Sequence, residues 1–159
     1  MNAKETIMKR SFAKTLMVTA ITSLALGMAS TASADDKGCS NASLHGTFAY
    51  TSTGTIVAPP EIAGPIAEVG SQTFDGGGGT SATATISTNG SMQPLTIVGT
   101  YKVNPDCTGT AALQVSPFGI TVHVLFVIID DGDGFQAMET DNGLVITRVG
   151  RKLYPGRAI

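Results

Sequence analysis

The stretch TSATATISTNGSMQPLTIVGTYKV, from Thr80 to Val103, decides the fold class of this chain. Its first part alternates hydroxyl side chains with alanine and isoleucine. Its second part places Leu95, Ile97 and Tyr101 on one face of an extended chain. Asn89-Gly90 between the two parts favours a type I′ turn, because both central residues of that turn need positive φ. The sequence therefore predicts a β-hairpin with strands at 80–88 and 92–103.

Six further segments share this strand composition, and Gly, Pro, Asn or Asp residues separate them. They are Leu44–Thr53, Ile66–Phe74, Cys107–Val115, Ile120–Ile129, Phe135–Thr140 and Leu144–Val149. Eight strands with mostly tight turns predict an all-β fold, an eight-stranded antiparallel up-and-down barrel, because an open sheet would leave two unpaired edges. A β-sandwich is the rival interpretation, but it needs long crossing connections, and only Gly54–Pro65 is long enough.

The first 34 residues have the pattern of a secretory signal peptide. Four basic residues precede or border the apolar run Leu16–Met28, and Ala32-Ser33-Ala34 follows as an A-x-A cleavage pattern. The run has about 13 residues, whereas a transmembrane helix needs roughly 20, so we expect no membrane span. We expect export to the periplasm or the medium with cleavage after Ala34, which leaves a single β-barrel domain at 35–159.

Cys39 and Cys107 both lie in the expected mature chain. In an oxidising compartment, a disulfide between them is the simplest prediction. Residues 35–159 hold six basic and eleven acidic residues, a net charge of −5. This charge argues against nucleic acid as a partner, because phosphate binding needs a clustered positive surface.

The sequence gives no pattern for a resident metal or cofactor. His45 and His123 have no ligand spacing to either cysteine. The glycines Gly76–Gly79 precede a strand and lack a nearby lysine, which argues against a phosphate-binding loop. Asp130–Gly134 does not fit a calcium loop of the EF-hand type, since no register places glycine at the sixth position. We interpret it as a turn, and a loosely held calcium ion is the alternative.

The segment Ile120–Ile129 is apolar on both faces, apart from Thr121 and His123. A strand at the surface of a barrel normally has one polar face. We therefore expect its outer face to be covered, either by the Pro- and Gly-rich loop Ala58–Gly64 or by a second subunit in a homo-oligomer.

The segment Leu44–Tyr50 (LHGTFAY) resembles the opening strand of calycin-type barrels, in which lipocalins and avidins begin with G-x-W, and Phe48 stands at the Trp position. Gly99-Thr100-Tyr101 has the same shape. The layout is also similar to the small barrels of allene oxide cyclases and dirigent proteins. The resemblance implies a closed barrel that binds apolar molecules. It assigns no catalytic residue, and the chain has no Trp.

We expect the lumen to bind a small apolar molecule, as in a carrier or sequestering protein, without a cofactor. The expected lining residues are Phe48, Tyr50, Ile86, Ile97, Tyr101 and His123. One alternative is an isomerase or cyclase, with His123 or Glu139 as acid or base. Each of these two residues also has a purely structural interpretation. His123 could be buried with one hydrogen bond, and Glu139 could form an exterior ion pair with Arg148. A second alternative is an oligomeric envelope or interaction module without a ligand.

Overall fold

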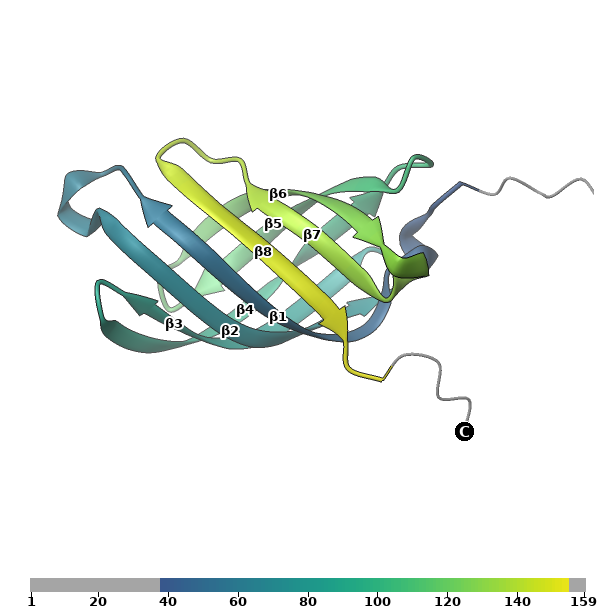
Figure 1. The fold of residues 1–159 in the computed structure, drawn as a ribbon, viewed down its shortest axis with the longest axis horizontal. Helices are drawn as coiled ribbons and strands as arrows, with labels where there is room; N and C mark the ends of the chain where they lie inside the picture. The colour runs from purple at the N-terminus through teal and green to yellow at the C-terminus, as the bar shows by residue number, and fades with distance from the viewer. Residues whose placement is uncertain (1–37, 155–159) are drawn as a thin grey trace, which may run out of the picture. The chain divides into compact units, whose positions relative to one another are not determined.

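The computed structural model describes residues 38–154, and in this part eight antiparallel strands close into a barrel (Figure 1). The strands are β1 (His45–Ile56), β2 (Gly64–Asp75), β3 (Gly79–Thr88), β4 (Ser91–Val103), β5 (Thr108–Ser116), β6 (Ile120–Ile129), β7 (Gly134–Glu139) and β8 (Leu144–Lys152). Each strand pairs with its neighbour in the chain, and β1 also pairs with β8. The predicted up-and-down barrel is confirmed. The predicted signal peptide and its cleavage after Ala34 lie outside the described residues.

The hairpin of β3 and β4 has the predicted turn and the predicted faces. Asn89 and Gly90 have φ values of 51° and 85°, as a type I′ turn requires, and Thr88 pairs with Ser91 across the turn. Because side chains alternate along a strand, Ala82 and Leu95 point into the barrel while Thr83 is exposed. The same alternation orients the other six strands.

One end of the barrel is closed by packed aromatic rings. Phe74 makes edge-to-face contacts with Phe48, Tyr101 and Phe135, with ring centroids 5.1–5.6 Å apart. The ring of Phe135 lies over Gly150 of β8, where a Cβ atom would come within 2.2 Å of it. Glycine at this position therefore makes room for the aromatic cluster.

A short helical turn, η1 (Asn41–Ser43), lies across this end of the barrel. The Asn41 side chain accepts a hydrogen bond from the Val103 backbone, and the Tyr101 hydroxyl donates to the Leu44 carbonyl oxygen. The predicted disulfide between Cys39 and Cys107 is present and links the segment just before η1 to the turn that precedes β5 (Thr108–Ser116). The closed end is thus held by side chains and by a covalent bond.

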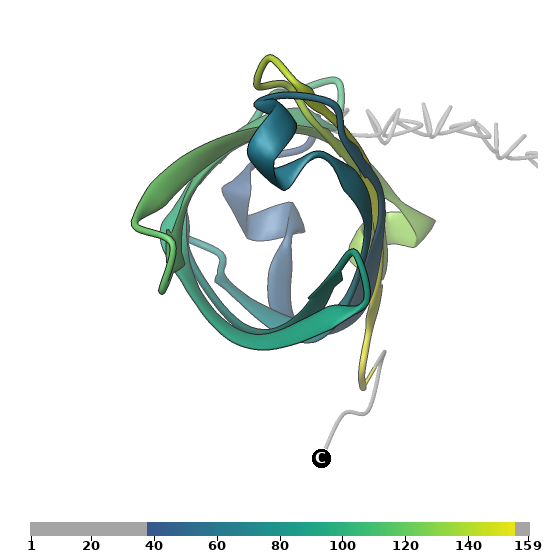
Figure 2. The ribbon, with the colours of Figure 1, turned by 90° about the vertical axis from the view of Figure 1, so that its left-hand side faces the viewer.

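The other end of the barrel is open. In Figure 2, the view is from this end, with η2 (Pro60–Ile62) at the near rim and the strands forming a ring behind it. The segment around η2 is tied to the rim, since Val57 donates to the Gly143 carbonyl oxygen and the Asn89 side chain donates to that of Ala63.

The outer face of β6 is uncovered. The residues of its inward face, Val122, Val124, Phe126 and Ile128, are buried, but on the outward face Leu125 is 48% exposed and Val127 is 38% exposed. The expectation that Ala58–Gly64 covers this face is wrong, because that loop is hydrogen-bonded along the open rim. A second subunit on β6 stays a prediction.

The acidic segment after β6 forms a turn, and two of its three carboxylates have basic partners. η3 (Asp130–Gly132) reverses the chain, Asp130 pairs with Arg151, and Asp133 lies 3.4 Å from Lys152 Nζ. Within residues 38–154, no three His, Cys, Asp or Glu side chains are grouped in a way that would hold a metal ion. In the same range, the structure has no helix long and apolar enough to cross a membrane.

Candidate functional site

The open half of the barrel contains a cavity of about 300 Å³. Aliphatic side chains from several strands form its wall, among them Ile66, Ile86, Leu95, Ile97, Val115 and Ile146. Small-molecule pockets have this character, apolar walls with a few polar groups at fixed positions, and this volume is at the small end of their range. Two of the predicted lining residues, Ile86 and Ile97, therefore lie in the wall of the cavity.

The predicted aromatic residues Phe48, Tyr50 and Tyr101 are all buried inside the barrel, but they do not line this cavity. Phe48 and Tyr101 belong to the packed closed end, and Tyr50 lies beneath Arg148. Whether any of the predicted residues contacts a ligand stays a prediction.

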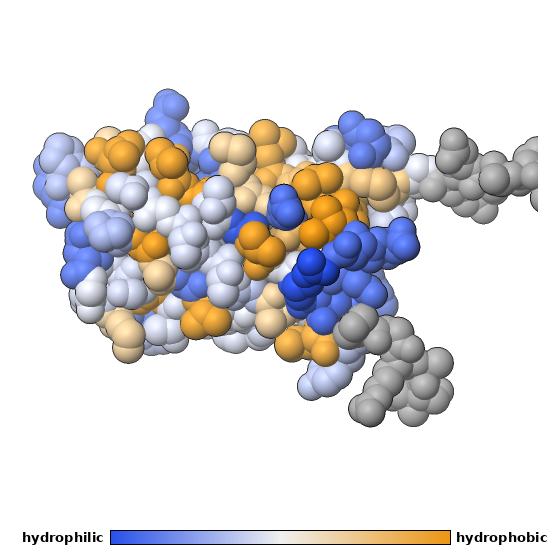
Figure 3. All heavy atoms as spheres, in the orientation of Figure 1, coloured by the Kyte–Doolittle hydropathy of each residue, from blue (hydrophilic) through white to orange (hydrophobic). Residues whose placement is uncertain are grey.

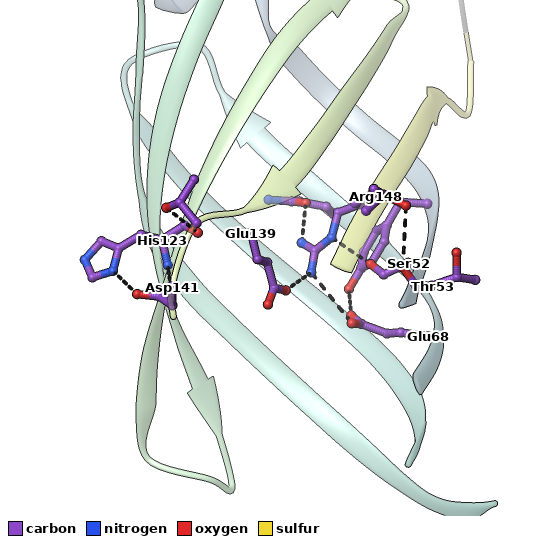
Figure 4. Close-up of polar contacts among 11 residues, drawn as sticks. Ser52, Thr53, Glu68, His123, Glu139, Asp141 and Arg148 are labelled. Carbon is purple, nitrogen blue, oxygen red and sulfur yellow. Dashed lines mark hydrogen bonds and ion pairs between the residues drawn. The ribbon is translucent and has the colours of Figure 1, made fainter. Parts of the chain in front are cut away.

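Three charged side chains form the base of the cavity: Glu68 of β2, Glu139 of β7 and Arg148 of β8. They point toward one another inside the barrel (Figure 4). Their inward direction follows from strand alternation, because Glu68 shares a face with Ile66, and Arg148 shares a face with Ile146. From the sequence, an ion pair of Glu139 and Arg148 on the outside of the barrel was one interpretation. The structure places both side chains inside the barrel. Two acids and one guanidinium here have little access to bulk water.

Arg148 is held in place by neighbouring side chains that do not line the cavity. Its Nε donates to the Ser52 hydroxyl at 2.9 Å, and its Nη1 lies 3.5 Å from the Gln72 side-chain oxygen. The guanidinium also stacks 4.5 Å from the centre of the Tyr50 ring. Its remaining nitrogen, Nη2, lies 3.6 Å from Glu68 and 4.0 Å from Glu139. The guanidinium is therefore oriented toward the two carboxyl groups.

The two acids differ in their partners. Glu68 accepts a hydrogen bond from the Tyr50 hydroxyl and lies nearer to Arg148. Glu139 lies beyond hydrogen-bond distance of Arg148, and burial raises its pKa from 4.5 to about 7, with Arg148 opposing and Glu68 adding to the rise. Burial also raises the pKa of Tyr50, which stays a neutral donor. Glu139 thus changes charge near neutral pH.

His123 lies outside the barrel, which corrects its expected place in the lumen. Its side chain is 58% exposed, and its Nδ1 lies 2.8 Å from the Asp141 carboxylate. The physical reason is the alternation of β6, which places His123 on the same face as Leu125 and Val127. In Figure 4, the His123–Asp141 pair lies apart from the three charges at the cavity base. His123 cannot act on a molecule in the lumen from this position.

Sequence reasoning missed Glu68, Ser52 and Gln72 as interior residues. A signal for them was present, because Ile66, Glu68, Gln72 and Phe74 alternate on one face of β2 and Phe48, Tyr50 and Ser52 on one face of β1. Polar residues in an inward register predict an interior polar layer.

The site combines an apolar wall with a polar base. An apolar body can fill the cavity while a polar head group meets Glu139, which is able to donate or accept a proton near pH 7. No family model, no curated protein and no solved structure matches this chain.

Proposed function

We propose that this protein binds a small apolar molecule in its lumen and serves as a carrier or sequestering protein. The observation that carries the proposal is the apolar cavity, which is open at one end and closed at the other by the aromatic cluster. An unfilled aliphatic cavity is unfavourable for stability and is occupied readily by apolar guests. The calycin-type resemblance of LHGTFAY agrees with this function.

A thermal-shift panel of fatty acids, terpenoids and small aromatics tests the proposal. At least one class is expected to raise the melting temperature, because a ligand that binds only the folded state stabilises it. The matched variants are Ile86→Trp, which fills the cavity, and Thr85→Trp, which adds the same ring to the outer face one residue away. The first is expected to abolish the shift and the second to retain it. No shift with any class would contradict the proposal.

The proposed place of action is the periplasm or the medium. The leader pattern of residues 1–34 and the disulfide between Cys39 and Cys107 support it, since disulfides persist in oxidising compartments. When the full chain is expressed in a bacterium, we expect the periplasm or the medium to contain a protein whose mass corresponds to a chain that starts at Asp35. A full-length protein in the cytoplasm would contradict export.

A second candidate function is acid–base isomerisation, favoured by Glu139 at the cavity base. With a pKa near 7, its carboxylate is able to remove a proton from one carbon of a bound enone and return it to another. The probe is 3-cyclohexenone, whose conversion to 2-cyclohexenone is followed by ultraviolet absorption. Catalysis that Glu139→Gln abolishes would support an enzyme, and binding without turnover would support the carrier.

We also propose that β6 takes part in a homo-oligomer. Apolar side chains are grouped in patches on the face with β7 and β8 (Figure 3), and the exposed residues of β6 to β8 include Leu125, Val127, Met138 and Val149. Light scattering of the wild type and of Leu125→Lys tests this. A wild-type protein that is monomeric at high concentration would contradict it.

A further inference from the structure

We infer that the lumen selects apolar molecules with one neutral, hydrogen-bond-accepting head group, a carbonyl or ether oxygen, which lies against Glu139 at the base of the cavity. This inference rests on the proposed binding function and adds the chemical class of the ligand.

The first support is the way in which the donors of Arg148 are used. Ser52 and Gln72 lie against two of its nitrogens, and the third faces Glu68 and Glu139. A ligand head that needs a free guanidinium would have to displace a carboxyl group. Glu139 lines the cavity and its Oε1 lies 4.0 Å from Arg148 Nη2, beyond hydrogen-bond distance, so we take its carboxyl oxygens as the contact for a ligand head group.

The second support is the charge of the base. Glu68, Glu139 and the more distant Asp141 provide negative charge, and Arg148 is the single cation that faces Glu139 within the described lumen. When Glu139 is protonated, Glu68 and Arg148 offset each other, so a ligand carboxylate or an ammonium head would each add an unbalanced charge. The walls opposite Glu139, from β3 to β6, contribute aliphatic side chains such as Ile86, Leu95 and Val122. Burial of either charged head is therefore unfavourable.

The third support is the protonation of Glu139. Its pKa of about 7 means that it is mainly a neutral acid at pH 6 and mainly a carboxylate at pH 8. The neutral acid donates a hydrogen bond to a carbonyl oxygen, whereas the carboxylate only accepts. Binding of an acceptor-only ligand is therefore expected to weaken as pH rises through 7.

The test uses displacement of the neutral fluorescent probe N-phenyl-1-naphthylamine by four ten-carbon molecules: 2-decanone, 1-decanol, decanoate and decane. At pH 6, 2-decanone is expected to bind about tenfold more tightly than decanoate. From pH 6 to pH 8, its affinity is expected to fall about tenfold, in proportion to the neutral fraction of Glu139. The affinity of 1-decanol is expected to fall less, because a hydroxyl also donates to the carboxylate.

Two variants separate Glu139 from other effects. Glu139→Gln keeps a donor of similar size and is expected to bind 2-decanone equally at pH 6 and pH 8. Asp106→Asn, which changes an exposed carboxylate in the turn before β5, is expected to keep the wild-type pH dependence.

The outcomes distinguish the inference from the function on which it rests. Tighter binding of decanoate than of 2-decanone, or wild-type binding of 2-decanone that does not change with pH, overturns the inference alone when decane and the probe still bind. Failure of the probe and of all four molecules to bind overturns the proposed function as well.

Discussion

The two halves of the barrel are built from the same eight strands but differ in how they are filled. In the closed half, four aromatic rings, η1 and the disulfide fill and seal the interior. In the open half, aliphatic side chains line the wall and leave a cavity of about 300 Å³. Because alternation points the same face of each strand inward along its whole length, the difference arises from side-chain size and from the closing segments.

A polar layer lies between the two halves. Tyr50, Ser52 and Gln72 lie outside the cavity wall, and Arg148, Glu68 and Glu139 line the cavity. Buried polar groups are tolerated when each is hydrogen-bonded or paired, and in the described chain no fully buried side-chain polar atom is without a partner. The comparison teaches that tight aromatic packing and an open cavity occupy different lengths of the same strands.

Removal of an aromatic ring from the closed half is expected to have the largest effect. Phe48 has 0% exposure and contacts the rings of Phe74 and Phe135, so Phe48→Ala leaves a cavity that rigid neighbours cannot fill. We expect a loss of about 4–5 kcal/mol in the free energy of unfolding, measured by urea titration. Ile86→Ala is the counterpart in the open half, where Ile86 is a half-buried residue of the cavity wall. We expect this change to lower the free energy of unfolding by about 1 kcal/mol. Equal losses of unfolding free energy in the two variants would contradict the conclusion that the closed half is packed more tightly than the open half.

Removal of the central cation is expected to come next. Arg148→Met leaves Glu68 buried beside Glu139 without a compensating charge. We expect a loss of about 3–4 kcal/mol at pH 7, in the lower part of the range for a broken buried pair, because a buried carboxylate without its cation can bind a proton and become neutral.

The double variant Arg148→Met, Glu68→Gln is the control for this prediction. It removes both charges and is expected to regain more than half of the lost stability, since the penalty comes from the unpaired carboxylate. A double variant as unstable as the single one would show that Arg148 stabilises the barrel through packing on Tyr50.

The fold was predictable because its signals are local. The Asn89-Gly90 turn and the alternation of β3 and β4 specify one hairpin, and the remaining strands repeat the pattern. The strand ends differ from the predicted ones by at most three residues, as where β1 extends to Ile56 instead of Thr53 and β8 to Lys152 instead of Val149.

The site was only partly predictable, because it depends on which groups meet across the barrel. Glu68 and Arg148 are 80 residues apart in the chain, and β1 lies between their strands in the sheet. Alternation alone was sufficient to place each of them inside, but not to show that aromatic rings would pack at one end and leave the other open. His123 was misplaced because β6 is apolar on both faces, so its pattern does not distinguish inside from outside.

The protonation of Glu139 provides a pH test of the polar layer. Its pKa is raised from 4.5 to about 7 in the folded state, so the folded protein binds the proton more tightly. This contribution is fully present below pH 4.5 and is lost as pH rises through 7. We expect Glu139→Gln to be more stable than the wild type at pH 8, by up to about 3 kcal/mol, and close to it at pH 5. A difference that does not change with pH would mean that Glu139 is not desolvated.

The smallest effect is expected outside the barrel, at Asp141. It accepts hydrogen bonds from the backbone and the ring of His123, which hold the pKa of its carboxyl below the usual range. This stabilisation is present at neutral pH and is lost as pH falls through the lowered pKa. Because the pair is solvent-exposed, we expect Asp141→Asn to cost less than about 1 kcal/mol at pH 7, measured by urea titration, and to leave ligand binding unchanged. A loss comparable to that of Arg148→Met would mean that the exterior turn stabilises the open half as strongly as the interior charges do.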